Sequence, residues 1–427
     1  PARDRVKIDK RPVSLSDPQP LWMKHPNECT DEEYKEFYRK VFMDYKEPLF
    51  WIHLNMDYPF NLKGILYFPK INTEYDSIEG TIKLYNNQVF IADNIKEVIP
   101  EFLLLLKGVI DCPDLPLNVS RSALQNDGFV QKISEYIAKK VADKLTGMCK
   151  TDREAYEKYW DDISPFIKFG CIKDSKFADK LHDYILFKDL DNKYLTLKDC
   201  IEANKKEEAE HTEEETQENA EENKDEKEPE KTTVFYVTDP VQQSQYINMF
   251  KEAGKNAVIL SHNIDTAFIS HLEQRDQTLQ FKRIDADLTE ELKGGDAADD
   301  DTAKTLTELF RKNLNKEKLE VKVESLKNEA VSAMMMLSEE SRRMQDMMKM
   351  YNMYGMDPGM FGGQETLVLN INHPLVKFLA ENQESEHAAV ICEQLYDLAM
   401  ISHKQLSPDE MTKFVQRSND ILMLLTK

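Results

Sequence analysis

The first third of the chain alternates short apolar runs with turns, and this pattern predicts a mixed α/β fold. Four runs rich in aromatic and branched residues are typical of short strands. They are Phe50–Leu54, Leu62–Phe68, Thr81–Tyr85 and Val89–Ile91. A helix is predicted over residues 96–106, and a further strand over Gly108–Asp111. A long amphipathic helix is predicted over 128–145, because apolar residues recur there every three or four positions.

In the middle of the chain, the pattern of apolar residues predicts a helical connector followed by a small α/β unit. Residues 151–186 have a helical pattern. A strand over Val234–Val237, a helix over 241–253 and a strand over Ala257–Ser261 then form a strand–helix–strand unit, which favours parallel pairing of the two strands.

The last part begins after the polar run 294–301, which ends one domain and offers an N-cap to a helix over 303–313. It ends in two amphipathic helices, over 386–402 and from Ser407 onward, and Ser407-Pro408-Asp409-Glu410 forms a capping box. Their apolar faces suit either an ordinary core or a symmetric four-helix dimer, two helices from each subunit. The candidate interface residues are Leu395, Leu398, Phe414, Ile421, Leu422 and Leu425.

These patterns predict a multidomain α/β (α+β) protein with three parts. Residues 1–150 form a large α/β domain, 151–295 a helical connector with a small α/β subdomain, and 302–427 a mostly helical C-terminal dimerisation domain. An acidic insert, 203–232, interrupts the second part. Residues 205–231 carry thirteen acidic residues and five lysines, hence −8 of the net charge of −22. We expect this insert to be a disordered, solvated loop, since it has almost no apolar surface to bury; a partner-binding segment is the alternative.

Composition excludes several classes of function. The strong negative charge argues against nucleic-acid binding, which needs positive surface against phosphates. No apolar run is long enough to span a membrane, and the first residues lack the apolar segment of a secretory signal, so we expect a cytoplasmic protein. The six cysteines form no C-x-x-C pair and the nine histidines show no zinc spacing, so we expect reduced thiols and no metal site.

A loop between the predicted strand at 108–111 and the long helix carries candidate chemistry. Pro116 breaks regular structure, and Ser120 can cap a short helix that holds Arg121 and Gln125 four residues apart, on one face. A guanidinium beside an amide suits a cluster of anionic oxygens. By chemistry alone, an ordinary surface ion pair of Arg121 is the competing interpretation.

Methionine is concentrated late in the chain, where ten of the eighteen residues fall between Met334 and Met360. Met344, Met347, Met348 and Tyr351 share one helical face. Flexible, polarisable methionine suits a surface that accepts varied partners, although it also fills gaps in a core.

The stretch L-P-L-N-V-S-R-S-A-L-Q at 115–125 resembles the catalytic loop of the middle domain in the ninety-kilodalton heat-shock chaperone family, in its bacterial HtpG branch. Other segments resemble the same family in the same order. They are Pro20–Trp22, Asn27–Tyr38, Gly64–Pro69, Ile82–Tyr85, Val89–Ile91, Lys107–Asp111 and Phe166–Gly170. The resemblance covers residues 20–427 apart from the acidic insert, and it includes only the middle and C-terminal domains of the family.

The resemblance implies a molecular chaperone that binds unfolded or partly folded client proteins and forms a homodimer. It assigns Arg121 to the γ-phosphate of ATP, with Gln125 supporting that contact and Asn118 shaping the loop. It also implies that the methionine-rich segment contacts clients. ATP and Mg²⁺ would be held by an N-terminal domain that we expect to be missing, since the chain has no glycine-rich phosphate loop. No cofactor is expected on this chain, which alone should not turn over ATP. A stand-alone acidic scaffold is the alternative.

Overall fold

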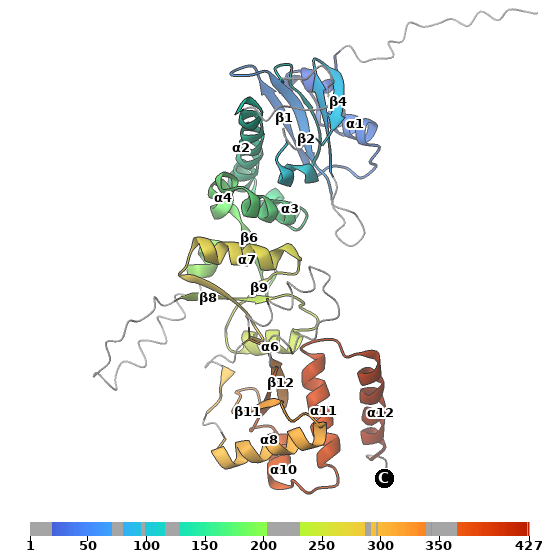
Figure 1. Ribbon diagram of the computed structural model, residues 1–427, viewed down its shortest axis with the longest axis vertical. Coiled ribbons are helices and arrows are strands. Elements are labelled where there is room, and N and C mark those ends of the chain that lie inside the picture. The colour runs from blue at the N-terminus through green and yellow to red at the C-terminus, as the bar shows by residue number, and fades with distance from the viewer. Residues whose placement is uncertain are drawn as a thin grey trace, which may run out of the picture. The chain divides into compact units, whose positions relative to one another are not determined.

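A computed structural model describes residues 19–70, 80–94, 99–115, 128–202, 231–286, 292–295, 298–338, 343, 365–424 and 426. The chain divides into two compact units, Pro1–Tyr184 and Ile185–Lys427 (Figure 1). The predicted division into three parts stays a prediction. The second unit contains two separate sheets.

The first unit is built on a five-stranded sheet of order β1-β2-β5-β3-β4. Its strands are β1 Phe50–Met56, β2 Leu62–Phe68, β3 Thr81–Asn86, β4 Val89–Asp93 and β5 Lys107–Asp111. Strand β3 pairs in parallel with β5, and the other neighbours pair antiparallel. The sequence-based strands are all confirmed. The helix predicted over 96–106 is wrong for the residues that are described. They form only the short 3-10 helix η3 Glu101–Leu105, which begins after Pro100.

Both faces of this sheet are covered. Helix α1 Asp31–Phe42 lies on one face and packs Tyr34 and Tyr38 against Tyr67 of β2. Helices α2 Gly128–Thr151 and α3 Arg153–Lys173 lie on the other (Figure 1), where Phe166 meets Phe68 at 5.1 Å between ring centroids. Because neighbouring strand residues point to opposite faces, nearly all of β2 is buried. The remaining elements of this unit are η1 Leu21–Met23, η2 Pro26–Glu28, α4 Ser175–Leu181 and η4 His182–Tyr184.

The second unit starts with a five-stranded sheet of order β10-β8-β9-β6-β7. Its strands are β6 Leu186–Asp189, β7 Tyr194–Thr196, β8 Thr232–Val237, β9 Val258–Ile259 and β10 Leu279–Arg283, with helices α6 Ser244–Glu252 and α7 Ile264–Arg275. Strands β8 and β9 pair in parallel, which confirms the predicted strand–helix–strand unit.

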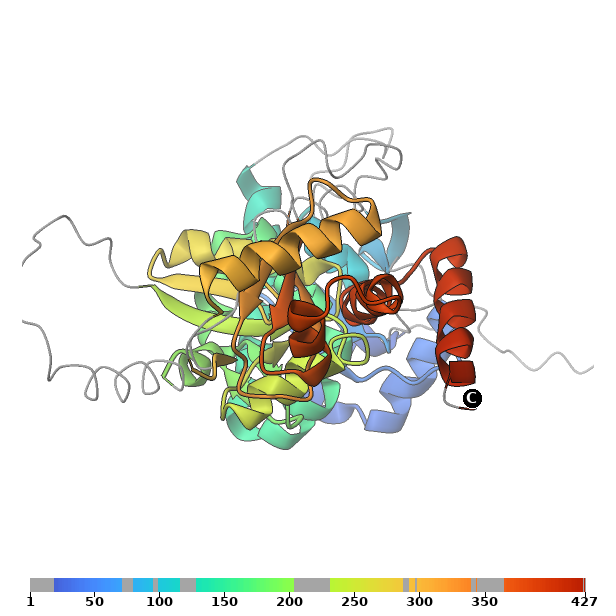
Figure 2. The same cartoon turned by 90° about the horizontal axis from the view of Figure 1, so that it is seen from below.

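The rest of the second unit combines helices with a three-stranded sheet that no local pattern indicated. Helix α8 Asp300–Leu314 begins at the N-cap Asp299, as the polar run predicted. The sheet has the order β11-β13-β12, from Glu320–Glu324, Thr366–Asn370 and Ala333–Met336. Helices α10 Pro374–Glu381, α11 Ala388–Ile401 and α12 Pro408–Leu424 follow. Figures 1 and 2 both show α12 standing beside α11.

Candidate functional sites

The predicted phosphate-contacting residues Asn118, Arg121 and Gln125 lie outside the described residues, but both ends of their loop are described. The chain leaves the sheet at the end of β5 and is described as far as Leu115, whose side chain is buried. It resumes at Gly128, the first residue of α2. The central β5 and the long α2 therefore fix the two points between which the loop runs.

A buried carboxylate holds the first of these points. Asp111, the last residue of β5, is 2% exposed. Its Oδ2 accepts hydrogen bonds from the Trp22 indole Nε1 at 3.3 Å and from the backbone N–H of Gln88 at 2.8 Å. Asp111 thereby connects β5 to the β3–β4 turn and to the 3-10 helix η1. Sequence reasoning missed this role; an acidic residue that ends an apolar strand is the signal that could have indicated it.

Side-chain amides hold the residues that follow. Asn86 Nδ2 donates to the carbonyls of Cys112 and Pro113, each at 3.1 Å. The backbone N–H of Asn61 donates to the carboxylate of Asp114 at 2.7 Å. Burial raises the pKa of the Cys112 thiol to about 12, so this side chain is a neutral part of the frame. The segment that leads into the loop is consequently held by residues of the β3–β4 and β1–β2 turns.

The methionine-rich segment is described only at its start. Met344, Met347, Met348 and Tyr351 lie outside the described residues. Arg343 next to them is held by two hydrogen bonds to the Glu273 carboxylate of α7, at 2.6 and 3.0 Å, and by one to the carbonyl of Phe281, at 3.1 Å. Arg343 thus fixes the chain to α7 and β10 directly before Met344, a contact that sequence reasoning also missed.

Three methionines at the beginning of the same cluster have a different environment. Met334, Met335 and Met336 lie on β12 and are buried. The core interpretation therefore holds for these three, since their strand is covered on both sides by the packed helices and strands around it.

The candidate dimer residues separate into covered and uncovered positions. Helix α12 has no buried residue in this single chain, and Leu422 is 58% exposed. Leu398 on α11 is 44% exposed, whereas Leu395 is 1% exposed and belongs to the core, so its side chain is already covered within the chain. Phe414 and Ile421 are half-buried, and Leu425 lies outside the described residues.

An ion-pair network joins α12 to α11. Arg417 donates to Glu393 at 2.7 Å and to the Gln394 side chain at 3.0 Å, and it also pairs with Asp397. Burial raises the pKa of Asp397, and the contact with Arg417 opposes that effect. The exposed apolar residues of α12, such as Val415 at 50% and Leu422 at 58%, lie outside this network.

The described residues contain neither a candidate metal site nor a candidate membrane-spanning helix. Within the described ranges, no cluster of three His, Cys, Asp or Glu side chains could hold a metal ion. No helix among the described residues is long and apolar enough to cross a membrane.

Comparison of the sequence with those of known proteins identifies relatives of this chain. The sequence profile described as "Hsp90 protein" matches residues 3–210. Chaperone protein HtpG of Bacteroides fragilis is 39% identical over 389 residues, covering 88% of this chain and 54% of the relative. The protein of the same name from Porphyromonas gingivalis is 37% identical, covering 87% and 53%. That of Magnetococcus marinus is 28% identical, covering 94% and 62%. The chain therefore spans about half the length of the first of these relatives.

Proposed function

Because this chain belongs to the Hsp90 family, in its HtpG branch, we propose that it is the client-binding and dimerising part of an ATP-dependent molecular chaperone. The loop sequence at 115–125 is the observation that carries the ATP-dependent element. It brings one guanidinium and two amides together, the donor set that suits phosphate oxygens. The anchored ends of the loop support this assignment, because a donor that acts on developing charge must be held in place before the reaction.

In this proposal, the chain supplies one side of an ATPase site. A nucleotide-binding domain of the family would hold ATP and Mg²⁺, and the bound nucleotide would supply the scissile γ-phosphoryl group. Arg121 would stabilise the charge that develops on that group, Gln125 would support Arg121, and Asn118 would shape the loop. The Asp111 hydrogen bonds would keep the loop at a constant position relative to the sheet.

The ATPase assignment is tested by fusing this chain to a nucleotide-binding domain of the family. Arg121→Ala should lower kcat by on the order of a hundredfold or more, with a much smaller change in KM, because the contact forms mainly in the transition state. Arg39→Ala is a matched control, since Arg39 is an exposed arginine of the same unit paired with Glu32. An unaltered turnover in folded Arg121→Ala protein would refute the role and favour the stand-alone acidic scaffold without ATP coupling.

Homodimerisation is proposed through the uncovered faces of α11 and α12. Replacing Leu398 and Leu422 together by Glu should convert a dimer into a monomer in sedimentation-velocity experiments, because two charges per subunit would have to be desolvated. Leu375→Glu is the control, since this α10 leucine is also exposed and lies outside the proposed interface. A wild-type monomer at micromolar concentration would contradict the proposal.

Client binding is proposed for the methionine-rich segment, with Met344, Met347, Met348 and Tyr351 as the contacting residues. Replacing the three methionines by Ser should weaken suppression of the aggregation of an unfolded model protein. The replacement Met335→Leu in the buried strand should not, because it preserves an apolar core residue. Equal suppression by the Ser variant and the wild type would exclude these residues as the client surface.

A further inference from the structure

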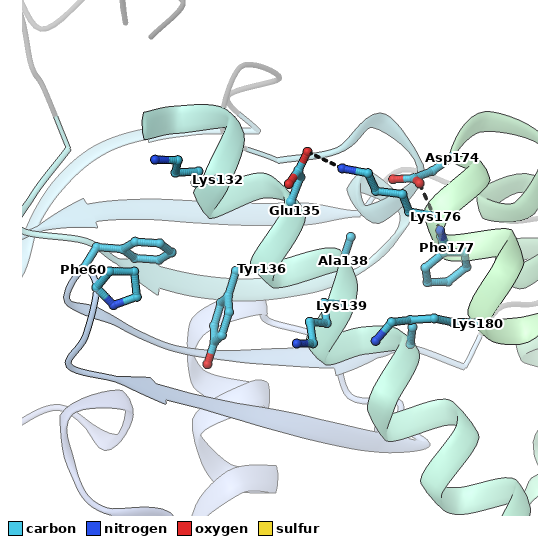
Figure 3. Close-up of a pocket in the computed structure, with 12 residues that line it drawn as sticks. Phe60, Lys132, Glu135, Tyr136, Ala138, Lys139, Asp174, Lys176, Phe177 and Lys180 are labelled. Carbon is cyan, nitrogen blue, oxygen red and sulfur yellow. Dashed lines mark hydrogen bonds and ion pairs between the residues drawn. The ribbon is translucent and has the colours of Figure 1, made fainter. Parts of the chain in front are cut away.

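A groove lies in the first unit on the side of α2 that faces α4, and neither the family assignment nor the proposed chaperone function uses it. Its walls are α2, α4 and the Pro59–Phe60 turn between β1 and β2, and it encloses about 370 Å³. Pockets that hold small molecules typically enclose roughly 300–1,000 Å³. Figure 3 shows Phe60 and Tyr136 at one end and Asp174 and Phe177 at the other. We refer to it as the α2/α4 groove.

The floor of the α2/α4 groove is apolar. Ala138 and Ala142 of α2 line it, and their small side chains leave the space that a larger residue would fill. Phe60 is held against Tyr136 and Phe129 in edge-to-face contacts, with centroids 5.8 and 5.6 Å apart. This end of the groove is thus formed by three aromatic side chains, of which Phe60 contacts the other two.

The rim is basic, in contrast to the strongly acidic chain. Four lysines line the groove beside two carboxylates, those of Glu135 and Asp174. Lys176 is paired with Glu135 at 2.9 Å, which raises the pKa of that lysine. Asp174 caps α4 by accepting from the backbone N–H of Phe177 at 3.0 Å. Both carboxylates of the lining are therefore already engaged.

Two of the lining lysines form no ion pair of their own. Lys180 pairs across the helices with Asp143 at 2.7 Å. Lys132 and Lys139 have no ion-pair partner among the residues that the structure describes. They lie seven residues apart on α2, which places them on the same helix face, two turns apart, with Tyr136 and the Glu135 carboxylate, paired with Lys176, between them. An apolar surface thus lies directly beside two cations.

We propose that the α2/α4 groove binds a small amphiphilic anion, namely an alkyl or aromatic carboxylate. The apolar body would lie on Phe60, Tyr136 and Ala138, and the carboxylate would be neutralised by Lys132 and Lys139. A small molecule is favoured over an acidic peptide, because aromatic side chains stand at both ends and the enclosed volume suits one short chain. This inference is independent of the ATPase, dimer and client proposals.

Isothermal titration calorimetry with decanoate, below its micelle concentration, tests the inference on the full chain. Lys132→Gln/Lys139→Gln should weaken decanoate binding at least tenfold and leave decanol binding unchanged. The matched control Lys144→Gln/Lys158→Gln removes two exposed charges outside the groove and should bind decanoate as the wild type does. Ala138→Leu should weaken both ligands by occupying the floor.

Two outcomes would overturn the inference. One is the absence of decanoate binding to the wild type, whether or not an acidic phenylalanine-containing pentapeptide binds. The other is equal binding of decanoate to the two double-lysine variants. Tryptophan fluorescence controls for folding, because all three tryptophans of the chain lie in this unit. The double-lysine variant alters only exposed side chains, so it keeps the test decisive if Ala138→Leu does not fold.

Discussion

The buried ion pair between Arg283 and Asp285 gives the sharpest stability prediction. Asp285 is 0% exposed, and both of its carboxylate oxygens accept hydrogen bonds from the Arg283 guanidinium, each at 2.6 Å. His403, which follows α11, lies 3.4 Å from the same carboxylate. The pair therefore sits where the end of β10 meets the C-terminal helices of the second unit.

Replacing Arg283 by Met should destabilise the second unit by about 3–5 kcal/mol, the usual cost of breaking a buried ion pair by removing one partner. Asp285 would lose two hydrogen bonds of 2.6 Å, both shorter than its 3.4 Å contact with His403. At a urea m-value of roughly 2–3 kcal/mol/M, the midpoint would fall by about 1–2.5 M. Adding Asp285→Asn removes the buried charge that Arg283 balanced and should restore more than half of the loss.

The positions of the three tryptophans allow unfolding of the two units to be measured separately. Trp22, Trp51 and Trp160 all lie in the first unit, so tryptophan fluorescence reports that unit, while far-UV circular dichroism reports both. The Arg283→Met change should move only the dichroism transition. Lys322→Met, which breaks an exposed 3.9 Å contact with Glu320, should cost less than about 0.5 kcal/mol. A loss below about 1 kcal/mol for Arg283→Met, or an equal shift in fluorescence, would refute the reasoning.

Three further results are expected. Ser407→Ala removes the capping box of α12, should cost about 1 kcal/mol, and should speed amide exchange in that helix; unchanged exchange would contradict it. Burial raises the pKa of Asp44, but hydrogen bonds from Lys107 and Tyr38 outweigh this and leave the pKa below 3.8. That stability is present above pH 3.8 and is lost as the pH falls further, so Asp44→Asn should flatten the acid limb of a fluorescence titration; an identical limb would count against it. Of six thiols, only half-buried Cys29 should react rapidly with a disulfide reagent before unfolding, because the other five are buried; a second fast thiol would exclude this.

Local sequence determined a large part of the fold. Short runs rich in aromatic and branched residues in 50–93 indicated four strands, because such residues favour the extended backbone of a sheet. The long amphipathic helix α2 followed from its apolar repeat, and Ser407 and Asp299 marked helix starts through their capping hydrogen bonds. Each of these signals acts within a few residues of the chain.

Only the tertiary structure decided which of these surfaces is covered. Strand β11 pairs in parallel with β13, more than forty residues further along the chain, and no local pattern encodes a pairing over that distance. Leu395 and Leu398 lie on the same amphipathic helix, yet the first faces the core and the second faces outward.

The same limit applies to the candidate sites. The letters at 115–125 indicated a phosphate-contacting loop, but the Asp111 carboxylate that holds its start depends on Trp22, 89 residues away in sequence. The α2/α4 groove likewise depends on contacts between distant segments, such as that of Lys176 with Glu135, 41 residues away in sequence. The local sequence determines which side chains each element carries. Which of these side chains come into contact depends on the packing free energy of segments that lie far apart in the chain.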